Sequence, residues 1–127
     1  MPTTKKQNQV QEIKNILSQC TIVVATGYQG MSASNMTDLR ARLKEQGIEY
    51  KVIKNTLTLR AANELGTEGM SDILIGPTAL AFGDVDMITV AKGINGYITT
   101  NRIPVIIHGA VMDGEIITAS QVVNLAS

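Results

Sequence analysis

The sequence predicts an α/β sandwich in which strands and helices alternate, with a mixed, partly parallel sheet and a C-terminal β-hairpin. Short apolar segments alternate with segments of helical periodicity, and this alternation favours parallel strand pairs joined by helices. Asp113-Gly114 then separates two apolar segments, 104–112 and 115–117. Such a dipeptide favours a tight hairpin turn, so these two strands are expected to pair antiparallel.

The N-terminal part of the chain is predicted to hold a helix, a strand and a second helix. Apolar residues at helical spacing predict a helix over residues 4–20, and the nearly continuous apolar run 21–26 predicts a strand buried on both faces. The second helix is expected to begin at a serine cap, Ser32 or Ser34, and to end at Gly47.

A second strand and a third helix follow. The β-branched and aromatic residues of 48–53 predict a strand with one inward face that includes Val52. Asn55 or Thr56 suits the N-cap of the next helix, which is expected to end at Gly66.

The elements after residue 66 are predicted from residues that interrupt strands and from residues that cap helices. Two apolar segments, 73–75 and 78–82, are separated by a Gly-Pro pair, and proline removes a donor from a strand ladder. Asp84 or Asp86 can cap a helix that follows. Thr118, with a glutamine three residues later, is typical of a capping box that opens a last short helix.

Charge is unevenly distributed although the formal net charge is zero. Residues 1–65 carry nine basic residues against five acidic ones, and residues 66–127 carry two against six, so the net charges of the two halves are about +4 and −4. This asymmetry predicts one face for an anionic partner, with attraction that weakens as salt concentration rises.

The composition argues against several function classes. Cys20 is the single cysteine, so no intrachain disulfide is possible and a reducing, intracellular compartment is expected. One cysteine and one histidine, His108, leave little for a metal site, and a structural role is favoured for both over a catalytic one. Helix capping explains Asp84 and Asp86 more simply than a catalytic carboxylate pair does. No signal peptide, membrane span or phosphate-loop motif is present. We therefore expect a soluble, cytoplasmic protein without cofactor, metal, membrane partner or small-molecule substrate.

The segment 51–57 carries the strongest functional signal. It places Lys51 in a strand and Lys54 immediately before a helix, and Arg60 follows within that helix. The first N–H groups of a helix lack internal partners and carry the positive end of its dipole, so this layout can hold a phosphate. On this segment alone the alternative stays open that the three cations are an ordinary solvated set beside a well-capped helix.

Three segments taken together resemble one protein family. They are Tyr28-Gln29-Gly30-Met31-Ser32 with Leu39-Arg40 downstream, Lys51-Val52-Ile53-Lys54-Asn55-Thr56-Leu57 followed by Arg60-Ala61, and Gly76-Pro77-Thr78-Ala79-Leu80-Ala81-Phe82 with Ala91-Lys92. In this order they are similar to the stalk-base protein of the large ribosomal subunit, the bacterial L10 (L-ten) family, which is related to the archaeal and eukaryotic P-zero proteins. The resemblance covers nearly the whole chain.

The resemblance implies that residues 1–127 form a single α/β domain that binds large-subunit ribosomal RNA at the base of the lateral stalk. A neighbouring stalk-base ribosomal protein is implied as a partner, with the cytoplasmic ribosome as the location. In this family a C-terminal helical extension binds dimers of the acidic stalk protein and so anchors the stalk that recruits translation factors. The chain ends at Ser127, so we expect it to lack that extension and to meet the stalk dimers only indirectly.

The RNA-binding residues implied by the resemblance lie in the first 60 positions. They are Tyr28, Gln29, Gly30, Met31, Ser32, Arg40, Lys51, Lys54, Asn55, Thr56 and Arg60. Tyr28 would pack or stack at the edge of the RNA, Lys54 and Arg60 would contact phosphates, and Asn55 and Thr56 would fix the turn and cap. Family members usually carry a basic residue at the position of Gln29 and often an arginine at that of Leu59. RNA binding is therefore expected to depend more on Lys51, Lys54 and Arg40.

Two other function classes remain as alternatives. One is a small cytoplasmic α/β protein-interaction domain that does not bind RNA. The other is an enzyme with an unrecognised pocket, for which the sequence supplies no convincing catalytic group.

Overall fold

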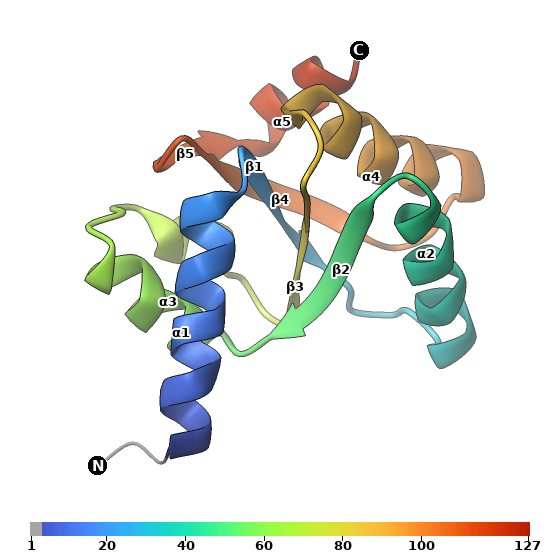
Figure 1. Cartoon of the computed structure of the whole chain (residues 1–127). Coiled ribbons are helices and arrows are strands. Elements are labelled where there is room, and N and C mark those ends of the chain that lie inside the picture. Colours follow the sequence, from blue (N-terminus) through green and yellow to red (C-terminus); the bar gives the residue numbers. More distant parts are fainter. Residues whose placement is uncertain (1–3) are drawn as a thin grey trace.

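A computed structural model describes residues 4–127 as a single five-stranded sheet with helices on both faces (Figure 1). The elements in chain order are α1 (Thr4–Gln19), β1 (Ile22–Gly27), α2 (Ala33–Glu45), β2 (Ile48–Ile53), α3 (Asn55–Glu64), the 3-10 helix η1 (Met70–Ile73), β3 (Thr78–Gly83), α4 (Met87–Asn101), β4 (Ile106–Met112), β5 (Glu115–Thr118) and α5 (Ala119–Ala126).

The prediction of a mixed, partly parallel sheet is wrong. The strand order is β2-β3-β1-β4-β5, and every neighbouring pair in it is antiparallel. The C-terminal hairpin, by contrast, is present as the pair β4 and β5.

The reason for the error lies in which strands become neighbours. The helix α2 joins β1 to β2, and these strands do run in the same direction, but β3 lies between them and pairs antiparallel with both. In the same way α4 joins β3 to β4, which run in one direction with β1 between them. The crossovers through α2 and α4 therefore connect strands of equal direction without making them partners, whereas α3 joins β2 to β3, which pair antiparallel.

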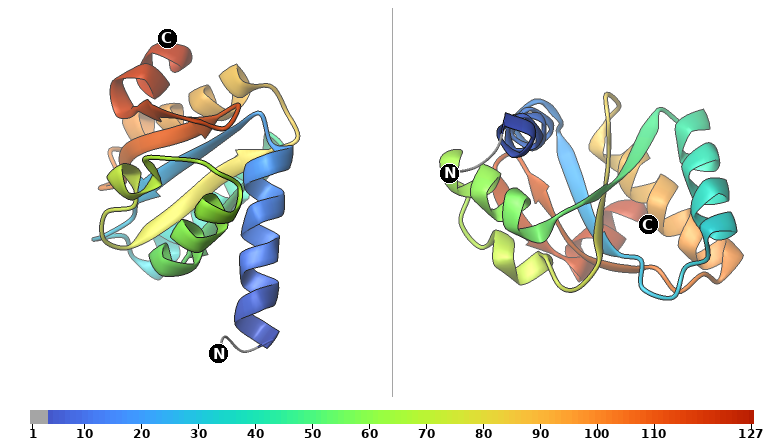
Figure 2. Two further views of the ribbon diagram at one scale, coloured as in Figure 1. Left: turned by 90° about the vertical axis from the view of Figure 1, so that its left-hand side faces the viewer. Right: turned by 90° about the horizontal axis from the view of Figure 1, so that it is seen from below.

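The helices divide into two layers (Figure 2). Helices α1 and α3 cover one face of the sheet together with η1, and helices α2, α4 and α5 cover the other. Strand β1 supplies both cores by alternation: Ile22 and Val24 pack on the α2 side, and Val23 and Ala25 pack on the α1 side. The expected strand buried on both faces is thereby confirmed.

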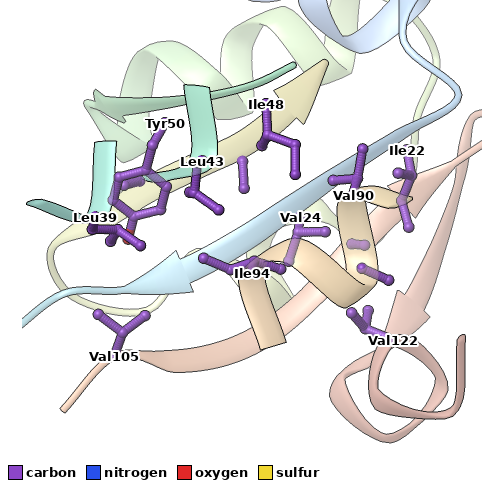
Figure 3. Packing of buried hydrophobic residues seen from close by; sticks show 14 of the residues in the cluster. Ile22, Val24, Leu39, Leu43, Ile48, Tyr50, Val90, Ile94, Val105 and Val122 are labelled. Carbon is purple, nitrogen blue, oxygen red and sulfur yellow. The ribbon is translucent and has the colours of Figure 1, made fainter. Parts of the chain in front are cut away.

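The larger core lies between the sheet and the layer of α2, α4 and α5. Figure 3 shows Leu39 and Leu43 of α2, Val90 and Ile94 of α4, and Val122 of α5 around Val24. All six of these side chains are fully excluded from solvent. At roughly 1.5–3 kcal/mol for each fully buried large apolar side chain, this packing holds the crossover helices α2 and α4 to the sheet.

Strand β2 lies at the edge of the sheet, and the prediction that Val52 lies on its inward face is wrong. Ile48 and Tyr50 point into the core, but Val52 remains 39% exposed, so it does not complete the inward face. Ile53, on the opposite face, is buried against α1 and α3. The open edge of β2 leaves backbone groups unpaired by a neighbouring strand.

Local signals in the second half of the chain are confirmed. Asp113 and Gly114 adopt φ values of 53° and 79°, the two positive values that a type I′ hairpin turn requires. Asp86 caps α4 by accepting a hydrogen bond from Thr89 N, and this bond lowers the pKa of the Asp86 carboxyl. Thr118 forms the expected capping box of α5.

Candidate nucleic-acid interface

The sheet topology brings the three motif segments to one end of the sheet. Strands β1 and β2 end there, whereas β3 and β4 run the opposite way and begin there. Two hydrogen bonds join the segments directly: Tyr28 N donates to the Pro77 carbonyl over 3.3 Å, and Asn55 Nδ2 donates to the Gly76 carbonyl over 2.9 Å. Residues about 20 to 50 positions apart in sequence thus form one surface.

The N-terminus of α3 is open. Its N-cap is Lys54, which has extended backbone angles and makes no side-chain cap hydrogen bond. The other α-helices from α2 to α5, all within the described residues, are capped by the side chains of Ser32, Asp86 and Thr118. The first N–H groups of α3 therefore remain available to an external acceptor, and the helix dipole favours an anion at that place.

The expected capping by Asn55 or Thr56 is wrong. Asn55 lies inside the first turn, and its amide is drawn instead to the carbonyl of Gly76. Its Oδ1 is buried and has no hydrogen-bond partner within the described chain. Thr56 is exposed. Asn55 consequently fastens the start of α3 to the loop before β3, and this leaves the helix terminus uncapped.

Two grooves follow the open edge of β2 and share Glu12, Lys51 and Val52. The first, of about 370 Å³, brings Tyr28, Lys51 and Lys54 together against α1. The second, of about 600 Å³, lies farther along the strand and includes Arg40. Four of the predicted residues therefore line these two adjoining grooves, which together we call the β2-edge groove.

The cations of the β2-edge groove are in different electrostatic states. Lys51 forms an ion pair with Glu12 of α1, and Arg40 Nε donates to the Tyr50 carbonyl over 3.3 Å. Lys54 is exposed and forms no ion pair with any residue of 4–127. Of the three, Lys54 is the cation that a phosphate can reach without displacing another group.

Comparison with known proteins identifies the family. A family model described as ribosomal protein L10 matches residues 1–98. The large ribosomal subunit protein uL10 of Staphylococcus aureus, in strains JH9, Newman and N315, is 41% identical over 122 residues. These residues cover 96% of this chain and 73% of each relative.

The chain belongs to the ribosomal protein L10 family. This confirms the resemblance found in the three motif segments, and with it the expected class of structural ribosomal protein of the large subunit. The L10 family consists of structural proteins, so the enzyme alternative is excluded.

The structure of this L10-family chain gives some predicted residues a structural task. Gly30 adopts φ 92°, which favours glycine, Met31 packs on the larger core, and Ser32 caps α2 through Asn35 N. These three residues shape the loop after β1 and do not line the β2-edge groove. Gln29, in the same loop, lines a different pocket beside His108.

Arg60 is not brought into the β2-edge groove. It lies beyond the first turn of α3 and forms an ion pair with Glu64, with 3.4 Å between Nε and Oε2. Glu64 also pairs with Lys14 of α1. The prediction that Arg60 acts beside Lys54 therefore finds no support in the geometry of this L10-family chain.

Sequence reasoning missed the part of α1 in the interface. Gln9, Glu12 and Ile13 line the β2-edge groove opposite Lys51, although they lie about 40 residues earlier in the chain. The opposite charges of Glu12 and Lys51 were visible in the sequence, but their pairing depends on how α1 packs on the sheet. A heptad-like pattern gives only the buried face of α1, and Glu12 lies beside it.

Cys20, the single cysteine of this L10-family chain, is partly buried. Burial raises the pKa of the Cys20 thiol, with a smaller contribution from Asp84, so the thiol is held in its unreactive form. Residues 4–127 contain no cluster of three His, Cys, Asp or Glu side chains that could hold a metal ion. None of the helices in this same range is long and apolar enough to cross a membrane.

Proposed function

We propose that this chain binds large-subunit ribosomal RNA at the base of the lateral stalk, mainly through the sugar-phosphate backbone. The observation that supports this most strongly is the uncapped N-terminus of α3 with Lys54 beside it. Oriented N–H donors and an unpaired cation together bind a phosphate better than either does alone. Tyr28 and Lys51 line the same groove, so an RNA strand seated at α3 extends along the edge of β2.

Assembly within the large subunit follows from this proposal. A neighbouring stalk-base ribosomal protein then binds to this chain beside the RNA. The chain anchors the lateral stalk, whose acidic dimers bind through a helical extension of the kind found in the L10 family. Membrane and small-molecule partners have no part in it.

The proposal is tested with the substitution Lys54→Ala and a matched control, Lys92→Ala. Both lysines are exposed, but Lys92 lies on α4 in the opposite helix layer. Binding to a stalk-base fragment of large-subunit ribosomal RNA is measured at several salt concentrations. Each phosphate contact contributes about 0.7–0.9 to the slope of log affinity against log salt. Lys54→Ala should therefore weaken binding and reduce the slope by about 1, whereas Lys92→Ala should leave both unchanged.

Two results would contradict the proposal. If Lys54→Ala behaves like Lys92→Ala, the open terminus of α3 is not a phosphate site. If the unmodified chain forms no salt-dependent complex with the RNA, the chain acts as a protein-interaction domain instead. Arg60→Ala is expected to have a smaller effect than Lys54→Ala, because Arg60 is paired with Glu64 outside the groove.

A further inference from the structure

A small pocket lies at the same end of the sheet as the β2-edge groove, where β1 ends and β4 begins. It has a volume of about 140 Å³ and is formed by the end of β1, the loop before β3 and the first residues of β4. A cavity of about 150 Å³ holds a single benzene ring. This pocket therefore has room for one planar ring system.

The walls of the pocket are apolar and exposed. Ile75 and Ile106 are 58% and 62% exposed, the highest values among the large hydrophobic residues of the described chain that remain exposed. Pro77 and Pro104 complete these walls. Two exposed isoleucines beside two prolines form a surface on which a flat apolar face can pack.

The two polar side chains of the pocket have no hydrogen-bond or ion-pair partner among residues 4–127. The imidazole of His108 and the amide of Gln29 both line the pocket, and neither side chain forms a hydrogen bond or ion pair within residues 4–127. The histidine is thus not the satisfied structural group that the sequence favoured. Its position depends on Gly27, because a Cβ there would lie 2.5 Å from His108 Nε2. Gly27 provides the space that the imidazole occupies.

Two hydrogen bonds link a wall of the pocket to segments beside the groove. Gly76 and Pro77 form one of its walls, and the same two residues accept hydrogen bonds from Asn55 and from the backbone of Tyr28. Asn55 follows Lys54 directly. The pocket is therefore within reach of a nucleic-acid strand held at the N-terminus of α3.

We infer that this pocket receives a single unstacked nucleobase of the bound RNA. The inference rests on the proposed function and adds a base-binding site to a surface that otherwise contacts only the backbone. The base packs against the isoleucine and proline walls and against the His108 ring, and the Gln29 amide supplies a donor and an acceptor for its polar edge. Unpaired bases are recognised in this way by histidine stacking and by side-chain amides. The chain has no tryptophan and one phenylalanine, so His108 is one of few rings available for stacking.

The experiment compares His108→Ala and Ile106→Ala with the matched control Ile88→Ala. Ile88 is 48% exposed on α4, away from the pocket, so its replacement controls for the loss of an exposed isoleucine. The probe is the stalk-base fragment of large-subunit ribosomal RNA. Base accessibility is read by chemical modification of unpaired bases, and backbone accessibility by hydroxyl-radical cleavage. Thermal unfolding of each variant confirms that it remains folded.

With the unmodified chain, one unpaired base should be protected from modification. His108→Ala and Ile106→Ala should each expose that base and weaken binding about tenfold, the loss expected for one stacked base. Their backbone footprint and salt slope should stay unchanged, because neither substitution removes a lysine or an arginine. If His108→Ala fails to fold, Ile106→Ala still decides the question, since its exposed side chain contributes little to the core.

Three results would overturn the inference. If both variants protect the base and bind as the unmodified chain does, while Lys54→Ala binds more weakly, the base pocket is refuted and the proposed function stands. If RNA binding is unchanged but binding of the neighbouring stalk-base protein is lost, the pocket holds a protein side chain. If the unmodified chain does not bind the RNA at all, the inference fails together with the proposed function.

Discussion

The substitution Thr26→Val tests how β1 is joined to the strand that carries the groove. Thr26 is fully buried, and its hydroxyl lies 3.0 Å from the Ala79 carbonyl and 2.5 Å from the Tyr50 hydroxyl. A carbonyl can only accept, so the Thr26 hydroxyl donates to Ala79 and accepts from Tyr50. Thr26 therefore links β1 to both β3 and β2.

The expected loss of unfolding free energy follows from the hydrogen bonds that valine cannot make. Valine preserves the shape of Thr26 but removes two hydrogen bonds, each worth about 1 kcal/mol net. It also leaves the buried Tyr50 hydroxyl without a partner, which costs about 1–3 kcal/mol when not relieved. We therefore expect Thr26→Val to destabilise the fold by about 3–5 kcal/mol. Tyr50→Phe should cost only about 1 kcal/mol, because Thr26 keeps its bond to Ala79.

A double-mutant cycle measured by urea unfolding provides the assay. Once Tyr50 is phenylalanine, Thr26→Val no longer strands a hydroxyl, so the double variant should lose about 2 kcal/mol, less than the sum of the single losses. Thr37→Val is the control, because the exposed Thr37 hydroxyl bonds only the Ala33 carbonyl of its own helix. The reasoning fails if Thr26→Val costs no more than Thr37→Val, or if the cycle is additive.

Further predictions concern alkaline stability, glycine packing and the charge of the groove. Burial and a carboxylate acceptor raise the pKa of Tyr97 to about 12, so between pH 10 and pH 12 the unfolded chain loses this proton first and stability should fall with rising pH. Tyr97→Phe should flatten that fall in urea unfolding curves. Gly83→Ala should destabilise by about 1–3 kcal/mol in urea unfolding, because its Cβ would lie 2.3 Å from a backbone carbonyl oxygen. Gly96→Ala, in a helix with nothing within 4 Å of the new Cβ, should stabilise by about 0.5–1 kcal/mol. Glu12→Gln should release Lys51 from its ion pair and raise RNA affinity severalfold with a steeper salt dependence; an unchanged slope would show that Lys51 does not contact phosphate.

The local signals of the sequence were sufficient for much of the fold. The Asp113-Gly114 turn, the capping box at Thr118 and the cap at Asp86 were predictable because each depends on residues within a few positions of one another. Partner choice between strands was not predictable in this way. Apolar periodicity reports which faces of a strand are buried, but it contains no information on whether β3 inserts between β1 and β2.

The candidate site shows the same division. Lys54 beside a helix start was readable from the sequence, because a strand followed directly by a helix fixes that relation. The N-cap of α3 was not readable in this way, because the Asn55 amide donates a hydrogen bond to the carbonyl of Gly76, 21 residues later, and does not cap the helix. The place of Arg60 outside the groove was not readable for a similar reason. Its partner, Glu64, was visible at the i+4 position, yet the orientation of that helix face depends on how α3 packs against α1.

The position of β3 between β1 and β2, which the sequence did not predict, also brings the parts of the interface together. Had β1 and β2 been neighbours, the loops after them would have met at one end of the sheet, but the loop before β3 would have had no fixed place between them. With β3 between the two strands, the Gly76-Pro77 turn lies between the loop after β1 and the start of α3 and is bonded to both. The Gly76 carbonyl of that turn accepts a hydrogen bond from the Asn55 amide, so Asn55 does not cap α3 and the helix terminus stays open beside Lys54. The availability of the anion site is therefore a consequence of sheet order. A chain with zero net charge can present it because one unpaired lysine and a free helix terminus act locally, within about the 10 Å over which charges interact at moderate salt.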